Sequence, residues 1–185
     1  LDHWTQTPRY GFLVDFAPEK EGIPAMMDTL ARFHINGLQF YDWMYRHDQF
    51  LTDQESYRDP LGRLLSRETV ERLIAAAHER GIAAMPYTAI YASSDAFYRE
   101  HPDWALYQAS GEPFRLGENF LVYMDPRPGS AWVEHLLREF EEVLDELDFD
   151  GIHLDQYGDP KAAMDVAGKS FPLDEPIAET INLTV

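Results

Sequence analysis

Cysteine is absent from the sequence, and this absence excludes disulfide bonds, thiolate nucleophiles and cysteine ligands for metals. Basic residues are scarce, because 15 lysines and arginines face 33 aspartates and glutamates, for a formal net charge of −18. A surface of that charge repels phosphate backbones and anionic lipid headgroups, so we expect no nucleic-acid partner and no membrane partner. Neutral or cationic ligands suit this charge better.

Long apolar runs and phosphate-binding motifs are missing as well. No stretch reaches the roughly 20 apolar residues of a membrane-spanning helix. The opening residues LDHWTQTPRY lack the pattern of a signal peptide; since the first residue is leucine, an earlier signal could have been lost. Neither GxGxxG nor GxxxxGKS/T occurs, and no serine stands in a GxSxG motif. These absences argue against nucleotide cofactors and serine hydrolase chemistry, and we expect no cofactor.

What the sequence does contain is an alternation of short apolar segments and amphipathic segments of helical period. Its 185 residues, 45% of them hydrophobic and 14% aromatic, suffice for one domain with a sizeable core. Asn36-Gly37 is expected to close the first helix, and Pro86 to break the third strand or to take it out of its ladder. The spacing predicts strands at 10–16, 38–43, 82–91 and 149–155 and helices at 23–35, 66–80 and 132–147.

Strands separated by helices indicate right-handed parallel crossovers and an α/β fold. Two architectures satisfy this pattern, a (β/α)8 barrel of the TIM type and a doubly wound sheet. Polar, aromatic-rich segments follow the predicted strands in place of glycine-rich phosphate turns, and this favours the barrel. Because a complete barrel needs about 250 residues, we expect residues 1–185 to be its N-terminal half, with the first four strand–helix units. Missing sequence or a second chain would supply the remainder.

In such a barrel the carboxyl ends of the strands meet at one rim, which here would be rich in carboxylates and aromatic rings. Aromatic faces stack on the C–H faces of pyranose rings, while carboxylates and amides bond to the hydroxyls. A carboxylate can also attack an anomeric carbon and stabilise the cationic transition state. The pattern therefore predicts a carbohydrate site. The rim residues are Asp15, Tyr41, Asp42, Trp43, Tyr87, Tyr91, Asp155, Gln156 and Tyr157.

Several of these positions have a second, structural interpretation. Asp155 ends the apolar segment FDGIHLD either as a nucleophile or as a carboxylate that caps the following loop. His153 is either an interior histidine with a satisfied hydrogen bond or a ligand of a sugar hydroxyl. Asp159 is expected to shape its loop. His47 stands near two acids but has no second histidine at ligand spacing, so no metal site is expected.

Five stretches occur in the same order as in glycoside hydrolase family 66: PRYGFLVDF, HINGLQFYDWMYRHD, DPLGRLLSRETVERLIAAAHERGIAAMPYTAIY, MDP and FDGIHLDQYGD. The chain resembles that family, which contains endo-dextranases and cycloisomaltooligosaccharide glucanotransferases, from Trp4 to about Asp159. The resemblance implies a (β/α)8 catalytic barrel acting on α-1,6-linked glucan with retention of anomeric configuration, and Asp155 as its nucleophile. It also implies sugar subsites lined by Tyr41, Asp42, Trp43, His47, Tyr87 and Tyr91. His153 and Gln156 complete the predicted substrate-binding set.

The sequence departs from the family in two respects. The acid/base of the family is a glutamate on a later strand, several tens of residues beyond the nucleophile, and too little chain follows Asp155 to supply it. Glu175 and Glu179 fall in a helix-like tail and are not candidates. The flanking β-sandwich domains are also missing. We therefore expect activity in the full-length parent protein and not in this chain alone.

Three hypotheses follow from these observations. The first is a hydrolase or cyclising transglycosylase of dextran, between which the sequence does not choose. The second is a non-catalytic glucan-binding module. The third is an unrelated barrel enzyme, such as a metal-dependent isomerase. Because a polymeric glucan does not cross membranes, the first hypothesis implies an extracellular or cell-surface location.

Overall fold

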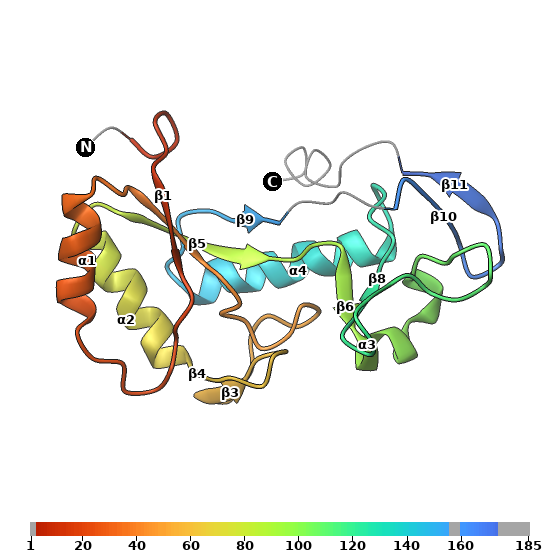
Figure 1. The fold of residues 1–185 in the computed structure, drawn as a ribbon, viewed down its shortest axis with the longest axis horizontal. Coiled ribbons are helices and arrows are strands. Elements are labelled where there is room, and N and C mark those ends of the chain that lie inside the picture. Colours follow the sequence, from red (N-terminus) through yellow and green to blue (C-terminus); the bar gives the residue numbers. More distant parts are fainter. Residues whose placement is uncertain (1–2, 156–159, 174–185) are drawn as a thin grey trace. The chain divides into compact units, whose positions relative to one another are not determined.

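The computed structural model describes residues 3–155 and 160–173, and the fold is drawn in Figure 1. Gln156, Tyr157 and Asp159 lie outside the described residues, as do Glu175 and Glu179. The described residues divide into two compact units. Unit 1 contains residues 3–45, 51–88 and 142–153, and unit 2 contains residues 46–50, 89–141, 154–155 and 160–173.

Unit 1 is built on a parallel sheet. Its strands are hydrogen-bonded in the order β1 (Tyr10–Leu13), β2 (Gly37–Phe40), β5 (Ala83–Thr88) and β9 (His153–Leu154). In β9, His153 is the last residue of unit 1, and Leu154 belongs to unit 2. β1 pairs with β2, and β2 with β5, in parallel register. The spatial order of these described strands follows the chain order, whereas a doubly wound sheet reverses its order at a switch point. The predicted α/β class with a parallel sheet is confirmed.

Helices connect these strands. α1 (Ile23–Arg32) lies between β1 and β2, α2 (Arg67–His78) between β2 and β5, and α4 (Ala131–Glu146) between β5 and β9. The hydroxyl of Ser66 caps α2 by accepting a hydrogen bond of 3.2 Å from the backbone N–H of Thr69. All three helices match predicted ones to within a few residues. No helix in the described ranges is long and apolar enough to cross a bilayer.

The closure of α1 differs from the prediction. The helix ends at Arg32, His34 adopts the left-handed conformation with φ of 59°, and Gly37 is the first residue of β2. The expectation that Asn36-Gly37 closes the helix is therefore wrong. Glycine is required at position 37 for another reason, because a Cβ there would lie 2.8 Å from the ring of Tyr10.

Pro86 lies inside β5, which continues to Thr88, so the predicted break of this strand is wrong. The ladder between β2 and β5 does end at the pair of Phe40 and Pro86. Proline has no N–H to donate, and a position at the end of a ladder loses the least by this. Pro86 is itself in register with Phe40, the last residue of β2, so the expectation that Pro86 leaves its ladder is wrong for the β2 side.

The two faces of this sheet differ in burial. Leu38 and Phe40 on β2 are both 0% exposed, and the ring of Phe40 packs on Phe16 and Phe149 at centroid distances of 5.6 and 5.2 Å. The alternate residue Gln39 is in register with Phe12 on β1, so these two side chains point to the opposite face. Phe12 is 60% exposed. We call this second face the open face, since it carries exposed apolar side chains.

Unit 2 contains the segment that follows β5. Here an antiparallel sheet is formed by β6 (Ala92–Ser94), β8 (Leu121–Tyr123) and β7 (Arg115–Leu116), in that order. Between β6 and β7 the chain forms α3 (Asp95–Glu100) and a 3-10 turn at Pro102–Trp104. β10 (Ala162–Met164) and β11 (Ser170–Pro172) form a hairpin. In unit 1, β3 (Ser56–Arg58) and β4 (Leu64–Ser66) form another hairpin. None of these short strands was predicted from the sequence.

A small core joins the hairpin to the rest of unit 2. The side chains of Leu106, Ala163, Phe171 and Leu173 are buried together, with Phe114 and Tyr123 packed against them. Tyr107 and Met164 form an isolated antiparallel bridge between the same two segments. The segment after β5 and the segment after β9 therefore fold as one unit.

Candidate active site

Four rings gather in unit 1 at the open face and at the carboxyl ends of its strands. The ring of Tyr41, directly after β2, lies 4.1 Å from that of Tyr87 on β5, and Tyr87 lies 5.9 Å from His153 on β9. Phe12 on β1 makes edge contacts with Tyr41 at 6.5 Å and with His153 at 6.4 Å. We call these four residues the aromatic cluster. Three of the predicted site residues, Tyr41, Tyr87 and His153, are thus brought together.

The cluster has both a stacking surface and a polar group. Tyr41 is 36% exposed and Phe12 is 60% exposed. Tyr87 is only 4% exposed, and its ring packs against the ring of Tyr41. The Nδ1 atom of His153 lies 2.8 Å from the side-chain nitrogen of Gln39 on β2. His153 is half-buried and has Gln39 as a hydrogen-bond partner, and both interpretations of this residue stay predictions.

Asp155 is the first residue after β9, a strand of two half-buried residues. The residue is half-buried and belongs to unit 2. Its nucleophilic role and its loop-capping role both stay predictions. Gln156, predicted to bind substrate beside it, lies outside the described residues.

Trp43 lies in the core of unit 1 and is 1% exposed. Its Nε1–H donates to the carbonyl of Tyr87 at 3.2 Å, and its own carbonyl accepts a bond of 2.5 Å from the hydroxyl of Tyr57. Its ring meets Phe149 edge-on at 5.3 Å. These contacts fix the segment after β2 relative to β5, and they give Trp43 the environment of a packing residue. Its contribution to a sugar subsite stays a prediction.

Asp42, between Tyr41 and Trp43, adopts a left-handed conformation with φ of 52°. Non-glycine residues in this region are uncommon and concentrate at turns and functional sites. The guanidinium of Arg63 lies 3.3 Å from Oδ2 of Asp42 and 2.6 Å from Oδ2 of the buried Asp59. This ion-paired turn aims Tyr41 and Trp43 in different directions, one toward the open face and one into the core.

His47 and Tyr91 belong to unit 2. His47 is 4% exposed, and its ring meets Phe120 edge-on at 6.4 Å. Tyr91 is half-buried and stacks on Tyr123 at 5.2 Å, with 30° between the ring planes. Within unit 2, Tyr91 and Tyr123 offer a second pair of stacked rings, and Tyr123 was not predicted.

Asp15, expected at the rim, is bound to its own loop. It forms an ion pair with Lys20 and accepts a bond of 3.1 Å from the backbone N–H of Ala17. The hydrogen bond from Lys20, with that from Ala17, lowers the pKa of the Asp15 carboxyl from its ordinary value. These contacts are those of a loop-forming carboxylate.

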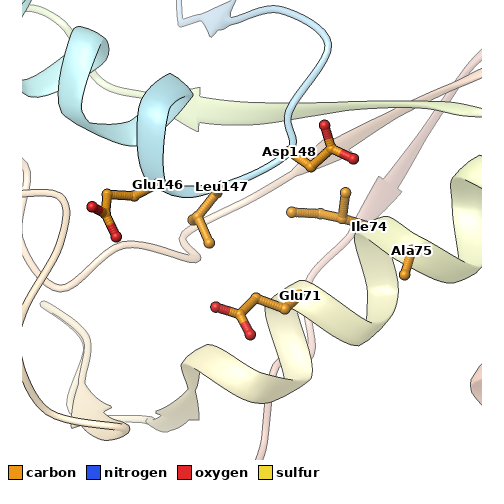
Figure 2. A pocket seen from close by; sticks show the side chains of 6 residues that line it. All are labelled: Glu71, Ile74, Ala75, Glu146, Leu147 and Asp148. Atoms are coloured by element: carbon orange, nitrogen blue, oxygen red, sulfur yellow. The ribbon is translucent and has the colours of Figure 1, made fainter.

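The structure also contains a pocket of about 210 Å³ away from this cluster, shown in Figure 2. It lies between α2 and the end of α4, and none of the predicted site residues lines it. Its acids are ion-paired, since Arg67 bonds both Glu71 at 2.9 Å and Glu146 at 3.1 Å. Across residues 3–155 and 160–173, no three His, Asp or Glu side chains are grouped to hold a metal ion. The lining residues are Glu71, Ile74, Ala75, Glu146, Leu147 and Asp148.

Gln39 and Phe12 are members of this site that the sequence interpretation missed. Gln39 lies inside the predicted strand LQFYDW, and Phe12 inside YGFLVDF. Two features of a parallel sheet could have found them. Side chains two residues apart on a strand face the same side, and the register between strands then aligns these side chains on one face. Register depends on pairing, and a strand read alone does not contain it.

Consecutive parallel strand–helix units with aromatic rings, an imidazole and an amide at one face define a protein of the βα class. The model of glycosyl hydrolase family 66 matches residues 1–184. The chain belongs to this family, and the resemblance drawn from the sequence is confirmed.

The relatives found by sequence and by structure agree with this assignment. Two cycloisomaltooligosaccharide glucanotransferases of Niallia circulans are 32% and 29% identical over 92% and 90% of this chain. A cycloisomaltooligosaccharide glucanotransferase of a Paenibacillus species, solved in complex with cycloisomaltoheptaose, covers 92% of the chain at 27% identity with a TM-score of 0.82. A maltogenic α-amylase of Thermotoga neapolitana shares the fold, with a TM-score of 0.57 at 17% identity over 82% of this chain and 39% of its own.

This chain spans 19% of the length of both curated relatives and 26% of the solved Paenibacillus chain. The activity of a whole protein therefore rests on more residues than those described here.

Proposed function

We propose that residues 1–185 form the N-terminal half of a (β/α)8 catalytic domain of a retaining glycoside hydrolase or transglycosylase that acts on α-1,6-linked glucan. The observation that carries this proposal is the aromatic cluster at the carboxyl ends of consecutive parallel strands, of which β9 is followed at once by Asp155. The unreversed strand order supports the barrel. The glucanotransferase names of the relatives support the substrate class.

Asp155 is the proposed nucleophile. In a retaining mechanism one carboxylate attacks the anomeric carbon to form a glycosyl-enzyme, and a second carboxyl group about 5–5.5 Å away protonates the leaving oxygen. A water molecule or a sugar hydroxyl then displaces Asp155, which gives hydrolysis or transfer. His153 precedes Asp155 by two residues, a spacing that puts side chains on one face of an extended chain. The acid would be a glutamate from outside the described residues.

The aromatic cluster would bind sugar rings. Tyr41 and Phe12 offer exposed ring faces for the C–H faces of glucose, and His153 offers a ring nitrogen for a hydroxyl. The Tyr87 ring packs against the Tyr41 ring, and the indole of Trp43 is hydrogen-bonded to the Tyr87 carbonyl. Binding of an uncharged glucan is compatible with the net charge of −18.

The exposed side chains of the open face support the view that more protein completes this domain. Tyr10, Phe12 and Val14 are 45%, 60% and 57% exposed, although β1 belongs to a parallel sheet, a type that is normally covered on both faces. The second half of a barrel, or a second chain, would cover them. Because glucan polymers stay outside cells, we place the protein at the cell surface or in the medium.

The test of this proposal is Asp155→Asn in the full-length protein that carries this chain. We expect turnover of isomaltooligosaccharides to fall by at least about a thousandfold, because the covalent step is lost, while dextran binding persists. Asp148→Asn is the matched control, since its side chain is 92% exposed on the loop before β9. Turnover of Asp155→Asn equal to that of the control would refute the nucleophile.

The second candidate is a glucan-binding module without chemistry, favoured by the exposed rings. Calorimetry with isomaltooligosaccharides, together with chromatography of all oligosaccharide products, separates the two. Binding without any shortened, lengthened or cyclic product from the full-length protein supports the module.

A further inference from the structure

Gln39 is a polar residue in an apolar position. It lies within β2, is 5% exposed, and is in register with Phe12 on β1 and Met85 on β5. Burying an amide opposes folding unless the amide is hydrogen-bonded. Its Oε1 is buried and finds no hydrogen-bond partner among the described residues. A methionine would fill a similar volume without that cost, so the amide at this position points to a role other than packing.

The contact that Gln39 does make crosses the sheet. Its Nε2 lies 2.8 Å from Nδ1 of His153, although β5 separates β2 from β9 in the strand order. The His153 ring is also held by two other rings, Phe12 edge-on at 6.4 Å and Tyr87 at 5.9 Å with 34° between the planes. These contacts hold the plane of the imidazole.

We propose that Gln39 is a positioning residue that holds the neutral imidazole of His153 in the tautomer with its proton on Nε2. An amide N–H can donate to Nδ1 only if that nitrogen carries a lone pair and no proton, so the ring proton resides on Nε2. With Gln39 in this position, the imidazole of His153 is neutral and its Nε2–H is the group that can donate a hydrogen bond. This inference rests on the proposed function, in which a glucan oxygen near the Asp155 nucleophile is the group that such a donor recognises.

The first test reads the tautomer and not the activity. Long-range ¹H–¹⁵N spectra of the histidine-labelled full-length protein, with the His153 signals assigned by their loss in His153→Gln, report which nitrogen carries the proton. We expect Nε2–H in the wild type. Gln39→Glu should place a proton on Nδ1, because a carboxylate only accepts. Nδ1–H in the wild type, or an Nδ1 that still lacks a proton in Gln39→Glu, would overturn the proposal.

The second test asks whether Gln39 acts through His153. We expect Gln39→Glu to lower kcat/KM on isomaltooligosaccharides by about ten- to a hundredfold, the range typical of residues that orient a functional histidine. In a His153→Gln background the same change should cost less than about threefold, since the residue it acts on is gone. An equal loss in both backgrounds would overturn the role.

A third variant separates positioning from folding. Gln39→Met keeps the volume and removes the hydrogen bond, so we expect its Tm to be equal to that of the wild type or higher, and its kcat/KM to fall. A fall in Tm together with unchanged kcat/KM would make Gln39 a packing residue and overturn the inference. If Asp155→Asn retained turnover, the proposed function would fail while the tautomer experiment would still decide the role of Gln39.

Discussion

The parallel sheet of unit 1 and the small core of unit 2 at the β10–β11 hairpin draw their buried residues from different kinds of segment. Leu38 and Phe40 of β2 and Leu73 of α2 are fully buried, each at a position that the strand or helix period assigns to the core. In the small core of unit 2, Leu106 lies outside the strands and Phe171 lies in a strand of three residues. The sheet of unit 1 is thus stabilised by periodic burial, and the small core of unit 2 by contacts between segments distant in sequence.

This difference matters for the proposed function, because the two units would contribute different parts of the glucan-binding protein. Unit 1 presents the aromatic cluster from the ends of parallel strands, which are rigid supports for functional groups. Unit 2 is made mostly of the segments that follow β5 and β9, together with residues 46–50, which follow β2. Segments after strands are where related folds vary their substrates. We expect changes in unit 1 to affect folding and the sugar site, and changes in unit 2 other than at Asp155 to affect which glucan is bound.

The largest expected effect comes from the core of unit 1. Phe40→Ala removes a ring that is 0% exposed and contacts Phe16 and Phe149, so we expect a loss of about 3–5 kcal/mol in the free energy of unfolding, measured by denaturant titration. Phe33→Ala is the matched control, since that ring is 73% exposed and should cost less than about 0.5 kcal/mol. Equal losses in the two variants would contradict the assignment of the core.

A smaller and more local effect is expected in unit 2. Phe171→Ala removes a ring that is 9% exposed, packs with Leu106 and Leu173, and lies 3.5 Å from the guanidinium carbon of Arg127. We expect about 3 kcal/mol, less than for Phe40, because the site is nearer the surface and can relax. Amide hydrogen exchange locates the loss.

The location of that loss decides whether the units are distinct. We expect faster exchange at unit 2 amides such as those of Tyr107 and Met164, whose backbones pair at 2.9 Å, and little change at β2 and β5. If β2 and β5 lose protection to the same degree, the two units unfold together and their comparison fails.

The same contrast explains which parts of the fold could be predicted. β2 and α2 were found because each carries an apolar period that a single segment displays, and Ser66 has the side chain and spacing of a helix cap. β6, β7 and β8 escaped because strands of two or three residues have no period, and their existence depends on partners far along the chain. His34, not glycine, takes the left-handed turn after α1, and no composition rule selects a histidine for it.

The site was predictable to a similar degree. Tyr41, Tyr87 and His153 could be found because they stand at or near strand ends, where parallel strands bring their residues together. Trp43 was grouped with them although it points into the core, since a strand end does not reveal which way the chain turns next. That turn is made at Asp42, whose left-handed conformation depends on its surroundings.

The smallest expected effect is a pH dependence confined to unit 2. Arg115 donates to Asp95 at 2.7 Å and Arg99 lies 2.6 Å from the same carboxylate, linking α3 to β7. The hydrogen bond from Arg115, then the charges of Arg99 and Arg115, hold the pKa of Asp95 below its ordinary value of 3.8. Because the pKa is lowered in the folded state, the stabilisation is present above about pH 3.8 and is lost as the pH falls through the folded value.

Asp95→Asn removes this titration. We expect unit 2 to be less stable than in the wild type at neutral pH, with the difference shrinking as the pH falls below the ordinary pKa of 3.8 and vanishing once the pH is below the lowered pKa of the folded state. Asp15→Asn serves as the matched variant in unit 1, where Lys20 lowers the pKa of the carboxyl in the same direction. Hydrogen exchange across an acid titration should assign each effect to its own unit. A difference for Asp95→Asn that persists or grows in acid would mean that this ion pair does not hold α3 to β7, and that the cohesion of unit 2 comes from its apolar contacts alone.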